Sequence, residues 1–242
     1  MDGNVQISLM ERLSNGCVVS CQALPDEPMF GAHHMAAMAR AAEAGGAVAI
    51  RANTPVDVRA IKDVCSLPVI GLYKKEYAGS DVYITPTILE ARDIAAAGAD
   101  VIAIDATHRP RPDGATLAEY VERIRAELPG VAILADVSTF EEGVQAMELG
   151  VELVSTTMSG YTPYSPKLEG PDVELVARLA ALKRTPVLAE GRIWTVEDCA
   201  ACFQAGAHAV VVGTAITRPQ EITKRFVAAA ARSAAQAVQS SD

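Results

Sequence analysis

Residues Pro186–Pro219 read PVLAEGRIWTVEDCAACFQAGAHAVVVGTAITRP, and this stretch decides the fold. It holds two apolar runs, 186–189 and 209–212, and each breaks at a glycine beside polar residues. Between them lies a helical pattern that opens on Thr195-x-x-Asp198, the spacing of a capping box. The stretch therefore predicts strand, helix, strand. In an eight-fold barrel, the glycine turns after the last two strands commonly bind phosphate through backbone N–H groups.

Glycine and proline recur at regular intervals along the chain, at the boundaries between predicted helices and strands. One set of predicted helices ends in a glycine that an apolar run follows at once, which fits a left-handed helix C-terminus. The alternate helices run toward a proline, which is tolerated at the start of a strand. The glycines are Gly45, Gly98, Gly150 and Gly206, and the prolines are Pro68, Pro129 and Pro186. Capping spacings are Thr54-x-x-Asp57, Thr87-x-x-Glu90, Ser138-x-x-Glu141 and Thr195-x-x-Asp198.

Eight apolar runs without polar alternation indicate parallel strands that are covered on both faces. They are Cys17–Cys21, Val48–Arg51, Val69–Tyr73, Val101–Asp105, Ala132–Asp136, Leu153–Thr157, Val187–Glu190 and Ala209–Gly213. Their alternation with helices predicts an α/β fold, a closed (β/α)8 TIM barrel that forms a single domain over residues 1–242. Residues 1–16 are expected to cap the barrel floor, and Val227–Asp242 is expected to form an alanine-rich, then polar, C-terminal tail with frayed last residues. A doubly wound open sheet is the alternative, but no G-x-G-x-x-G fingerprint supports it.

The composition narrows the class of partner. Hydrophobic residues make up 50% of the chain, enough for one large core, and the formal net charge of −9 argues against a nucleic-acid partner. No apolar stretch is long enough to span a membrane, and the N-terminus lacks the apolar run of a signal peptide. We therefore expect a cytoplasmic protein that binds neither nucleic acid nor membrane. A phosphorylated metabolite remains compatible with this charge.

No metal or redox site is predicted. Five cysteines are an odd number and fit reduced thiols, and Cys199-x-x-Cys202 lies inside a predicted helix without further ligands at metal spacing. His33-His34 is expected to belong to a loop or a first helical turn. Asp105 and Asp136 could bind magnesium, but no histidine cluster accompanies them. They are expected instead to orient ligand hydroxyls or to hold basic side chains in place.

A barrel of this kind carries its chemistry at the carboxyl ends of its strands. Polar residues follow nearly every predicted strand there, and they form a ring over an apolar interior. Polar groups at such depth must be hydrogen-bonded to one another or functional, and folding needs no such set of cations and carboxylates. The ring comprises Gln22, Arg51, Lys74, Asp105, Asp136, Thr156, Thr157, Glu190, Gly213 and Thr214.

Lys74 and Glu190 are the candidates for chemistry within this ring. A lysine at a barrel mouth can bind phosphate, form a Schiff base or carry a proton, whereas its neighbour Lys75 is expected to be solvated. Arg51 would lower the pKa of Lys74 and Glu190 would raise it, and the sequence does not sum these effects. Glu190 can be a second proton carrier, or a salt-bridge partner of Arg51 or Arg192.

Nine ordered blocks of the chain, spread over nearly its whole length, resemble one family. The blocks are VVSCQAL (Val18–Leu24), AIRA (Ala49–Ala52), PVIGLYKKEY (Pro68–Tyr77), VYITPT (Val82–Thr87), IDATHRPRPDG (Ile104–Gly114), ADVST (Ala135–Thr139), STTMSGYTPYS (Ser155–Ser165), AEGR (Ala189–Arg192) and VVGTAITRPQEITKRF (Val211–Phe226). By this resemblance the chain is identified as a member of the N-acylglucosamine-6-phosphate 2-epimerase family. Only the His33-His34 pair departs from the pattern.

The resemblance implies an activity and a set of residues. It implies interconversion of N-acetylmannosamine 6-phosphate and N-acetylglucosamine 6-phosphate in sialic-acid catabolism, without a metal or nucleotide cofactor. The catalytic lysine and glutamate of the family fall on Lys74 and Glu190. Its ligand-binding positions fall on Gln22, Arg51, Asp136 and Arg218, and its phosphate-binding turns fall on Gly191-Arg192 and Gly213-Thr214.

The chemistry of the reaction agrees with these residues. C2 of the open-chain sugar is α to the C1 aldehyde, so its proton is weakly acidic and inversion can pass through the deprotonated intermediate. Two opposed groups would remove and return the proton, and Arg51 or another donor could stabilise charge on the C1 oxygen. Whether Lys74 or Glu190 acts first, and whether one lysine does both, stays open, as does tolerance for N-glycolyl substrates.

Two other functions fit the same ring. Lys74 could be the Schiff-base nucleophile of an aldolase or lyase on a phosphosugar, or the barrel could bind a phosphosugar without catalysis. For any of these, the expected partner is a small phosphosugar, and a homodimer is a reasonable expectation for a barrel of this size.

Overall fold

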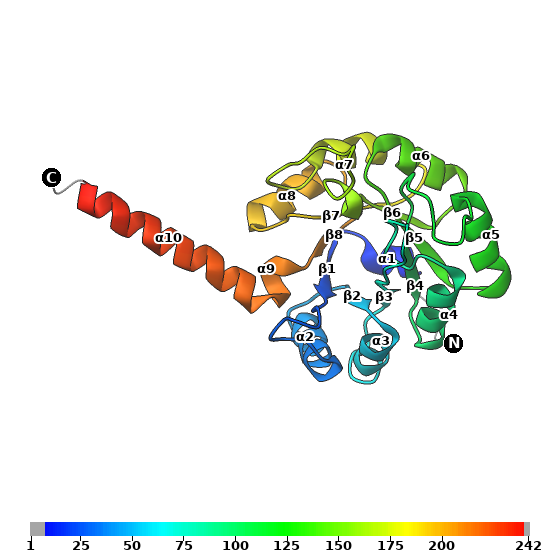
Figure 1. Ribbon diagram of the computed structural model, residues 1–242, viewed down its shortest axis with the longest axis horizontal. Coiled ribbons are helices and arrows are strands. Elements are labelled where there is room, and N and C mark those ends of the chain that lie inside the picture. Colours follow the sequence, from blue (N-terminus) through cyan, green and yellow to red (C-terminus); the bar gives the residue numbers. More distant parts are fainter. Residues whose placement is uncertain (1–7, 240–242) are drawn as a thin grey trace, which may run out of the picture.

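Eight parallel strands close into a barrel in the computed structural model, which describes residues 8–239 and the side-chain surroundings of residues 8–233. Each strand pairs with the next along the chain, and β8 pairs with β1 (Figure 1). The strands are β1 (Gly16–Cys21), β2 (Ala49–Asn53), β3 (Val69–Leu72), β4 (Val101–Asp105), β5 (Ala132–Asp136), β6 (Leu153–Ser155), β7 (Val187–Glu190) and β8 (Ala209–Val212). The predicted (β/α)8 barrel is confirmed.

The eight predicted strands all overlap observed strands, and the differences lie at their ends. β2 begins one residue later than predicted and runs past Arg51 to Asn53. β6 stops at Ser155 because Thr156–Met158 turn into a 3-10 helix, η1. At these ends the loops decide the backbone geometry, and apolar periodicity no longer reports it.

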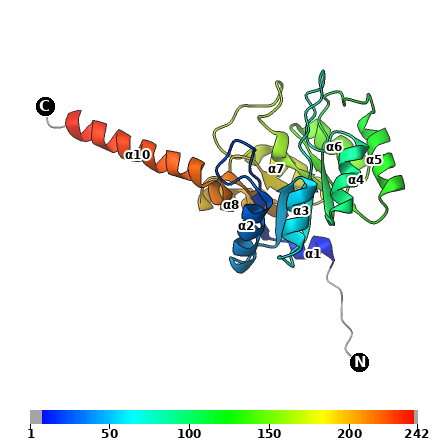
Figure 2. The same cartoon turned by 60° about the horizontal axis from the view of Figure 1, so that its bottom comes forward.

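Within residues 8–239, each of β1 to β7 is followed by an α-helix that covers the outside of the barrel (Figure 1). These helices are α2 (Ala32–Ala44), α3 (Pro55–Lys62), α4 (Ile88–Ala96), α5 (Leu117–Glu127), α6 (Phe140–Glu148), α7 (Val173–Ala180) and α8 (Val196–Gln204). β8 differs, because the short α9 (Thr214–Thr217) follows it and then α10 (Pro219–Gln239) extends away from the barrel (Figure 2). None of the helices in the described range is long and apolar enough to cross a membrane.

Threonine caps open several of these helices, and one predicted cap was wrong by one residue. Thr139, not Ser138, is the N-cap of α6, because the buried Glu142 carboxylate accepts the backbone N–H groups of both residues and the helix starts after them. The left-handed glycine predicted at the end of α2 is also displaced by one residue. Gly45 keeps a right-handed helical backbone, and Gly46 takes the left-handed conformation with φ +89°. The predicted caps that are observed are Thr54, Thr87 and Thr195.

Apolar side chains form one layer inside the barrel and another between the strands and the helices. The short helix α1 (Leu9–Leu13) lies at the barrel floor (Figure 2). Its fully buried Leu13 packs against the inner layer. The ring of His208 lies 2.8 Å from the carbonyl oxygen of Met10, which holds this helix to the start of β8. Residues 1–7 of the predicted capping segment and 240–242 of the predicted tail lie outside the described residues.

Gly71 allows α4 to approach β3 closely. A Cβ atom on Gly71 would lie 2.6 Å from Cγ2 of Ile94 and 2.8 Å from Cβ of Ala99. Contacts this short force neighbouring atoms to move, and Ala99 carries no flexible side chain that could give way. Glycine at this position therefore sets the distance between strand and helix just below the site end of β3.

We expect Gly71→Ala to lower the free energy of unfolding by about 1–3 kcal/mol, the usual cost of overpacking a core. Urea denaturation followed by circular dichroism measures this change. Gly170→Ala is the matched control, because its added Cβ would meet only Oδ1 of Asp198, at 4.0 Å. Equal stabilities of the two variants would contradict the close packing of α4 on β3.

Candidate active site

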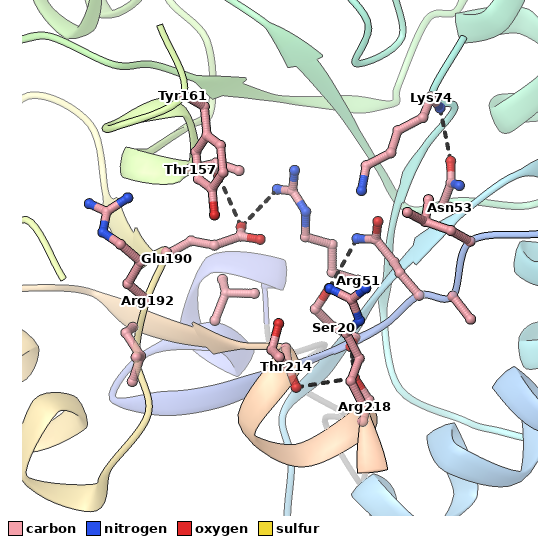
Figure 3. A pocket seen from close by; sticks show the side chains of 18 of the residues that line it. Ser20, Arg51, Asn53, Lys74, Thr157, Tyr161, Glu190, Arg192, Thr214 and Arg218 are labelled. Carbon is pink, nitrogen blue, oxygen red and sulfur yellow. Dashed lines mark hydrogen bonds and ion pairs between the residues drawn. The ribbon is translucent and has the colours of Figure 1, made fainter. Parts of the chain in front are cut away.

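One cavity of about 410 Å³ opens at the carboxyl ends of the strands (Figure 3). Its wall combines residues from the ends of β1, β2, β7 and β8 with residues from the loops beyond them. Asp136, fully buried at the end of β5, contacts this wall through Arg51. The predicted site residues in the wall itself are Gln22, Arg51, Lys74, Glu190, Gly191, Arg192, Gly213, Thr214 and Arg218.

A buried arginine links two carboxylates at this cavity. Arg51 is 1% exposed, and its Nη1 and Nη2 donate to Oδ1 and Oδ2 of Asp136 at 3.1 and 2.6 Å. Nη1 also lies 3.1 Å from Oε2 of Glu190. The hydroxyl of Thr157 lies 2.6 Å from Oδ1 of Asp136 and 3.0 Å from Oε2 of Glu190. Charges withdrawn from water persist only when paired in this way, and the salt bridge between Arg51 and Glu190 is thus present.

Lys74 enters the cavity from just beyond β3. Its backbone N–H donates to Oδ1 of Asn53 at 2.8 Å, and its backbone bridges Ile84 in antiparallel fashion. Its side chain points into the cavity (Figure 3). Burial lowers the pKa of Lys74, the charge of Arg51 lowers it further, and Glu190 opposes the shift. The balance of charges that the sequence left open therefore gives Lys74 a pKa below the ordinary value for lysine.

The neighbouring lysine has a different environment. The side chain of Lys75 is 45% exposed, which agrees with its predicted solvation, but its Nζ also donates to Oε1 of Glu90 at 2.9 Å. Tyr77 donates its hydroxyl to the same oxygen at 2.8 Å. Lys75 therefore belongs to a network at the start of α4, whereas Lys74 belongs to the cavity.

The carboxyl group of Glu190 has the opposite tendency to the amine of Lys74. Burial raises the pKa of Glu190; the nearby charge of Arg51 opposes this rise, and that of Asp136 adds to it. The side chain is 14% exposed and lines the cavity. An amine that loses its proton more readily than an ordinary lysine and a carboxyl that keeps its proton more readily than an ordinary glutamate thus line one cavity. Such a pair is suited to carry protons in opposite directions.

Two glycine turns form another part of the wall. After β7, Gly191 and Arg192 adopt left-handed backbone conformations with φ +111° and +55°. After β8, a Cβ on Gly213 would lie 3.3 Å from Cβ of Ser20, so glycine lets this turn approach β1 closely. The guanidinium of Arg192 donates to the carbonyl oxygens of residues 159 and 170. A phosphate contact at this turn would therefore come from backbone N–H groups and not from that guanidinium.

The wall residues that the sequence reasoning missed include Asn53, Tyr83 and Glu27. Asn53 lies two residues after Arg51 on the same face of β2, so the two-residue period of a strand was the signal that could have found it. Tyr83 and Glu27 lie in the loops after β3 and β1, where no periodicity reports side-chain direction. Burial raises the pKa of Tyr83 to about 12, so its phenol keeps its proton as a hydrogen-bond donor.

Several other predicted residues do not line the cavity. Asp105 accepts a hydrogen bond from Nη2 of Arg109 at 2.5 Å, so it holds a basic side chain, as Asp136 does. Cys199 and Cys202 are free thiols of α8, and Cys202 is fully buried in apolar packing. His33-His34 lies in the first turn of α2. Among the residues that the structure describes, no group of three or more His, Cys, Asp or Glu side chains could hold a metal ion.

We expect Lys74→Met to stabilise the protein near neutral pH by about 0.5–2 kcal/mol, because burial disfavours the ammonium form and methionine removes that charge. Since the pKa of Lys74 is lower in the folded chain than its ordinary 10.5, the gain is complete below the folded-state pKa. It should disappear as the pH rises to 10.5. Urea denaturation at a series of pH values measures it.

Lys75→Met is the matched control for this substitution. Its ammonium is paired with Glu90, so its loss should leave stability unchanged or lower it. A destabilised Lys74→Met protein at neutral pH would contradict the environment described for Lys74.

The chain matches known proteins over most of its length. A family model described as "Putative N-acetylmannosamine-6-phosphate epimerase" matches residues 35–232. A relative from Caldanaerobacter subterraneus subsp. tengcongensis is named "Putative N-acetylmannosamine-6-phosphate 2-epimerase". It is 55% identical over 223 residues, which cover 92% of this chain and 94% of the relative. A relative of the same name from Clostridioides difficile is 47% identical over 221 residues, which cover 91% of this chain and 98% of the relative.

Solved structures resemble the barrel to different degrees. The N-acetylmannosamine-6-phosphate 2-epimerase from Clostridium perfringens matches with a TM-score of 0.89 and 44% identity, over 94% of this chain and 98% of that chain. A thiamine phosphate pyrophosphorylase from Pyrococcus furiosus matches with a TM-score of 0.57 and 16% identity, over 90% of this chain and 93% of that chain. The second likeness concerns the fold alone.

Proposed function

The chain belongs to the N-acetylmannosamine-6-phosphate epimerase family, and from this premise we propose how its cavity interconverts N-acetylmannosamine 6-phosphate and N-acetylglucosamine 6-phosphate. One observation carries the proposal. Lys74 and Glu190, whose pKa values are shifted by burial in opposite directions, line one cavity beside the buried Arg51–Asp136 pair. Epimerisation at a carbon next to a carbonyl needs an unprotonated base and a protonated acid at the same time.

Proton exchange at C2 assigns a role to each of the two groups. In one direction, the neutral amine of Lys74 removes the C2 proton of the open-chain sugar, and the electron pair of the C2–H bond forms a C1=C2 double bond as the C1 oxygen takes up the negative charge of an enolate. The protonated carboxyl of Glu190 returns a proton to C2 on the opposite face, and the aldehyde re-forms. The protein ends with an ammonium and a carboxylate, so the net charge of the cavity is unchanged. In the reverse direction the roles exchange.

The remaining site residues bind and orient the substrate in this proposal. Arg51, held by Asp136 at both Nη1 and Nη2, keeps the Glu190 carboxyl beside C2 and supplies positive charge near the enolate. Gln22, with its amide 3.0 Å from Oγ of Ser20, lies at the end of β1 as a sugar contact. The turns at 191–192 and 213–214, together with Arg218, bind the phosphate, and this remote binding energy anchors the open-chain sugar.

The resemblance and the family also suggest a setting for the enzyme. We propose that it acts in the cytoplasm in sialic-acid catabolism, on a phosphosugar alone, without nucleic acid, metal or nucleotide. Turnover that is unchanged by dialysis against a chelator would agree with this part of the proposal. A Schiff-base aldolase that uses Lys74 is the second candidate, because a lysine with a lowered pKa also suits that chemistry.

Lys74→Ala and Glu190→Gln should each lower kcat by about 10²–10⁴-fold, the usual contribution of a general acid or base. Proton NMR of N-acetylmannosamine 6-phosphate in heavy water measures turnover, and wild-type protein should exchange the C2 hydrogen for deuterium. Lys75→Ala is the matched control and should remain active. Turnover without C2 exchange, or borohydride trapping of the sugar on Lys74, would contradict the epimerase and favour the aldolase.

We also propose a homodimer in which α10 of one copy packs on the barrel of the other. Every described side chain of α10 from Thr223 to Ser233 is exposed, including Phe226 at 73% and Val227 at 62%. A solitary helix gains little stability in water without an apolar partner. On the outer face of β1, beside α2, lies an apolar groove of about 320 Å³. α2 to α8 leave this position uncovered, so a second copy of α10 can fill it (Figure 1).

Phe226→Asp should therefore convert the dimer to a monomer, because a carboxylate cannot be buried in an apolar groove without large cost. Size-exclusion chromatography with light scattering measures the mass. Lys224→Asp places the same side chain on the opposite face of α10 and should leave the dimer intact. A monomeric wild-type protein, or a dimer that persists in Phe226→Asp, would contradict this interface.

A further inference from the structure

The carboxylate of Glu27 joins two segments that lie far apart in the sequence. It lies in the loop after β1, and its Oε2 accepts the backbone N–H of Leu24 at 2.8 Å. Its Oε1 accepts a hydrogen bond from Nε2 of Gln220 at 2.9 Å and forms an ion pair with Nη2 of Arg218. Only 9% of the Glu27 side chain is exposed. The first loop is therefore tied to the junction between α9 and α10 by one carboxylate.

Arg218 is held at one nitrogen of its guanidinium and has an unused donor at another. Its Nη2 is bound by Glu27, whereas its buried Nε finds no acceptor among the described residues. A buried donor without a partner is costly unless a ligand supplies an acceptor. Because Arg218 lines the cavity together with Thr214, an anionic oxygen of a ligand is a natural acceptor for this donor (Figure 3).

A carboxylate beside a phosphate-binding arginine has two opposing effects. Its negative charge repels the phosphate, which weakens binding. Its hydrogen bonds also hold a long, flexible side chain in one conformation before the ligand arrives, which strengthens binding because less freedom is lost later. The exposed fraction of Arg218 is still 32%, so water screens the repulsion, whereas the hydrogen bonds of the nearly buried Glu27 are screened far less.

We propose that Glu27 is a positioning residue, which orients the Arg218 guanidinium so that its unpaired Nε–H meets the phosphate of the substrate. Glu27 acts only through Arg218 and makes no contact with the reacting carbon. This inference rests on the proposed phosphosugar function. It predicts that the hydrogen-bond acceptor of Glu27 matters for substrate binding, that its charge matters little, and that kcat depends on neither.

Four variants separate these effects in steady-state kinetics with N-acetylmannosamine 6-phosphate. Glu27→Ala removes the acceptor and should raise KM about tenfold while kcat changes less than about threefold. Glu27→Gln retains an oxygen for Arg218 and should keep KM within about threefold of wild type. Glu27→Asp keeps the charge but is one methylene shorter, so it should raise KM as the alanine variant does. Asp26→Ala removes an exposed carboxylate from the same loop and should behave as wild type.

Inorganic phosphate provides a readout that does not need turnover. The rise in melting temperature that phosphate produces should be smaller in Glu27→Ala and Glu27→Asp than in Glu27→Gln. An unchanged or lower KM in Glu27→Ala, or a larger effect of Gln than of Asp, would overturn the proposal. If Glu27→Ala does not fold, the KM values of Glu27→Gln and Glu27→Asp still test the proposal, because only the glutamine variant is expected to keep KM near that of wild type. Absence of turnover in wild type would refute the proposed function, and the phosphate shifts would still test Glu27.

Discussion

The bidentate pair between Arg51 and Asp136 is the interaction on which the site depends. Both side chains are almost completely buried, and neither charge could stay inside the barrel without the other. The pair connects β2 with β5 across the barrel, so it needs the closed sheet to bring its members together. Its charges also act on Lys74, Glu190 and Tyr83, which line the cavity.

Burial and the charges of this pair together explain the opposite pKa shifts of Lys74 and Glu190. Burial penalises the charged form of each group, so the pKa of Lys74 falls and that of Glu190 rises. Arg51 adds to the first shift and opposes the second, and Asp136 does the reverse. The same buried setting therefore shifts both groups toward the protonation states that the proposed proton transfer requires.

The sequence predicted the barrel and many of the residues that line its cavity, because both follow from local patterns along each strand. Each strand of a parallel barrel is an apolar run that ends in a polar residue, so Glu190 at the end of β7 could be placed from its neighbours alone. The capping spacing predicted the start of a helix less exactly where two neighbouring residues could each be the N-cap. Ser138 has a capping spacing, yet the buried Glu142 carboxylate binds two N–H groups and moves the cap to Thr139.

By itself, the sequence determined the eight-fold alternation, the family and the identity of the polar residues at the strand ends, because these depend on short-range periodicity and on residue type. Only the tertiary structure decided which of those residues meet. The sum of charges around Lys74, the link from Glu27 to Arg218 and the departure of α10 from the barrel all involve groups far apart in the chain. Their distances arise from closure of the barrel and from packing, which no local pattern encodes.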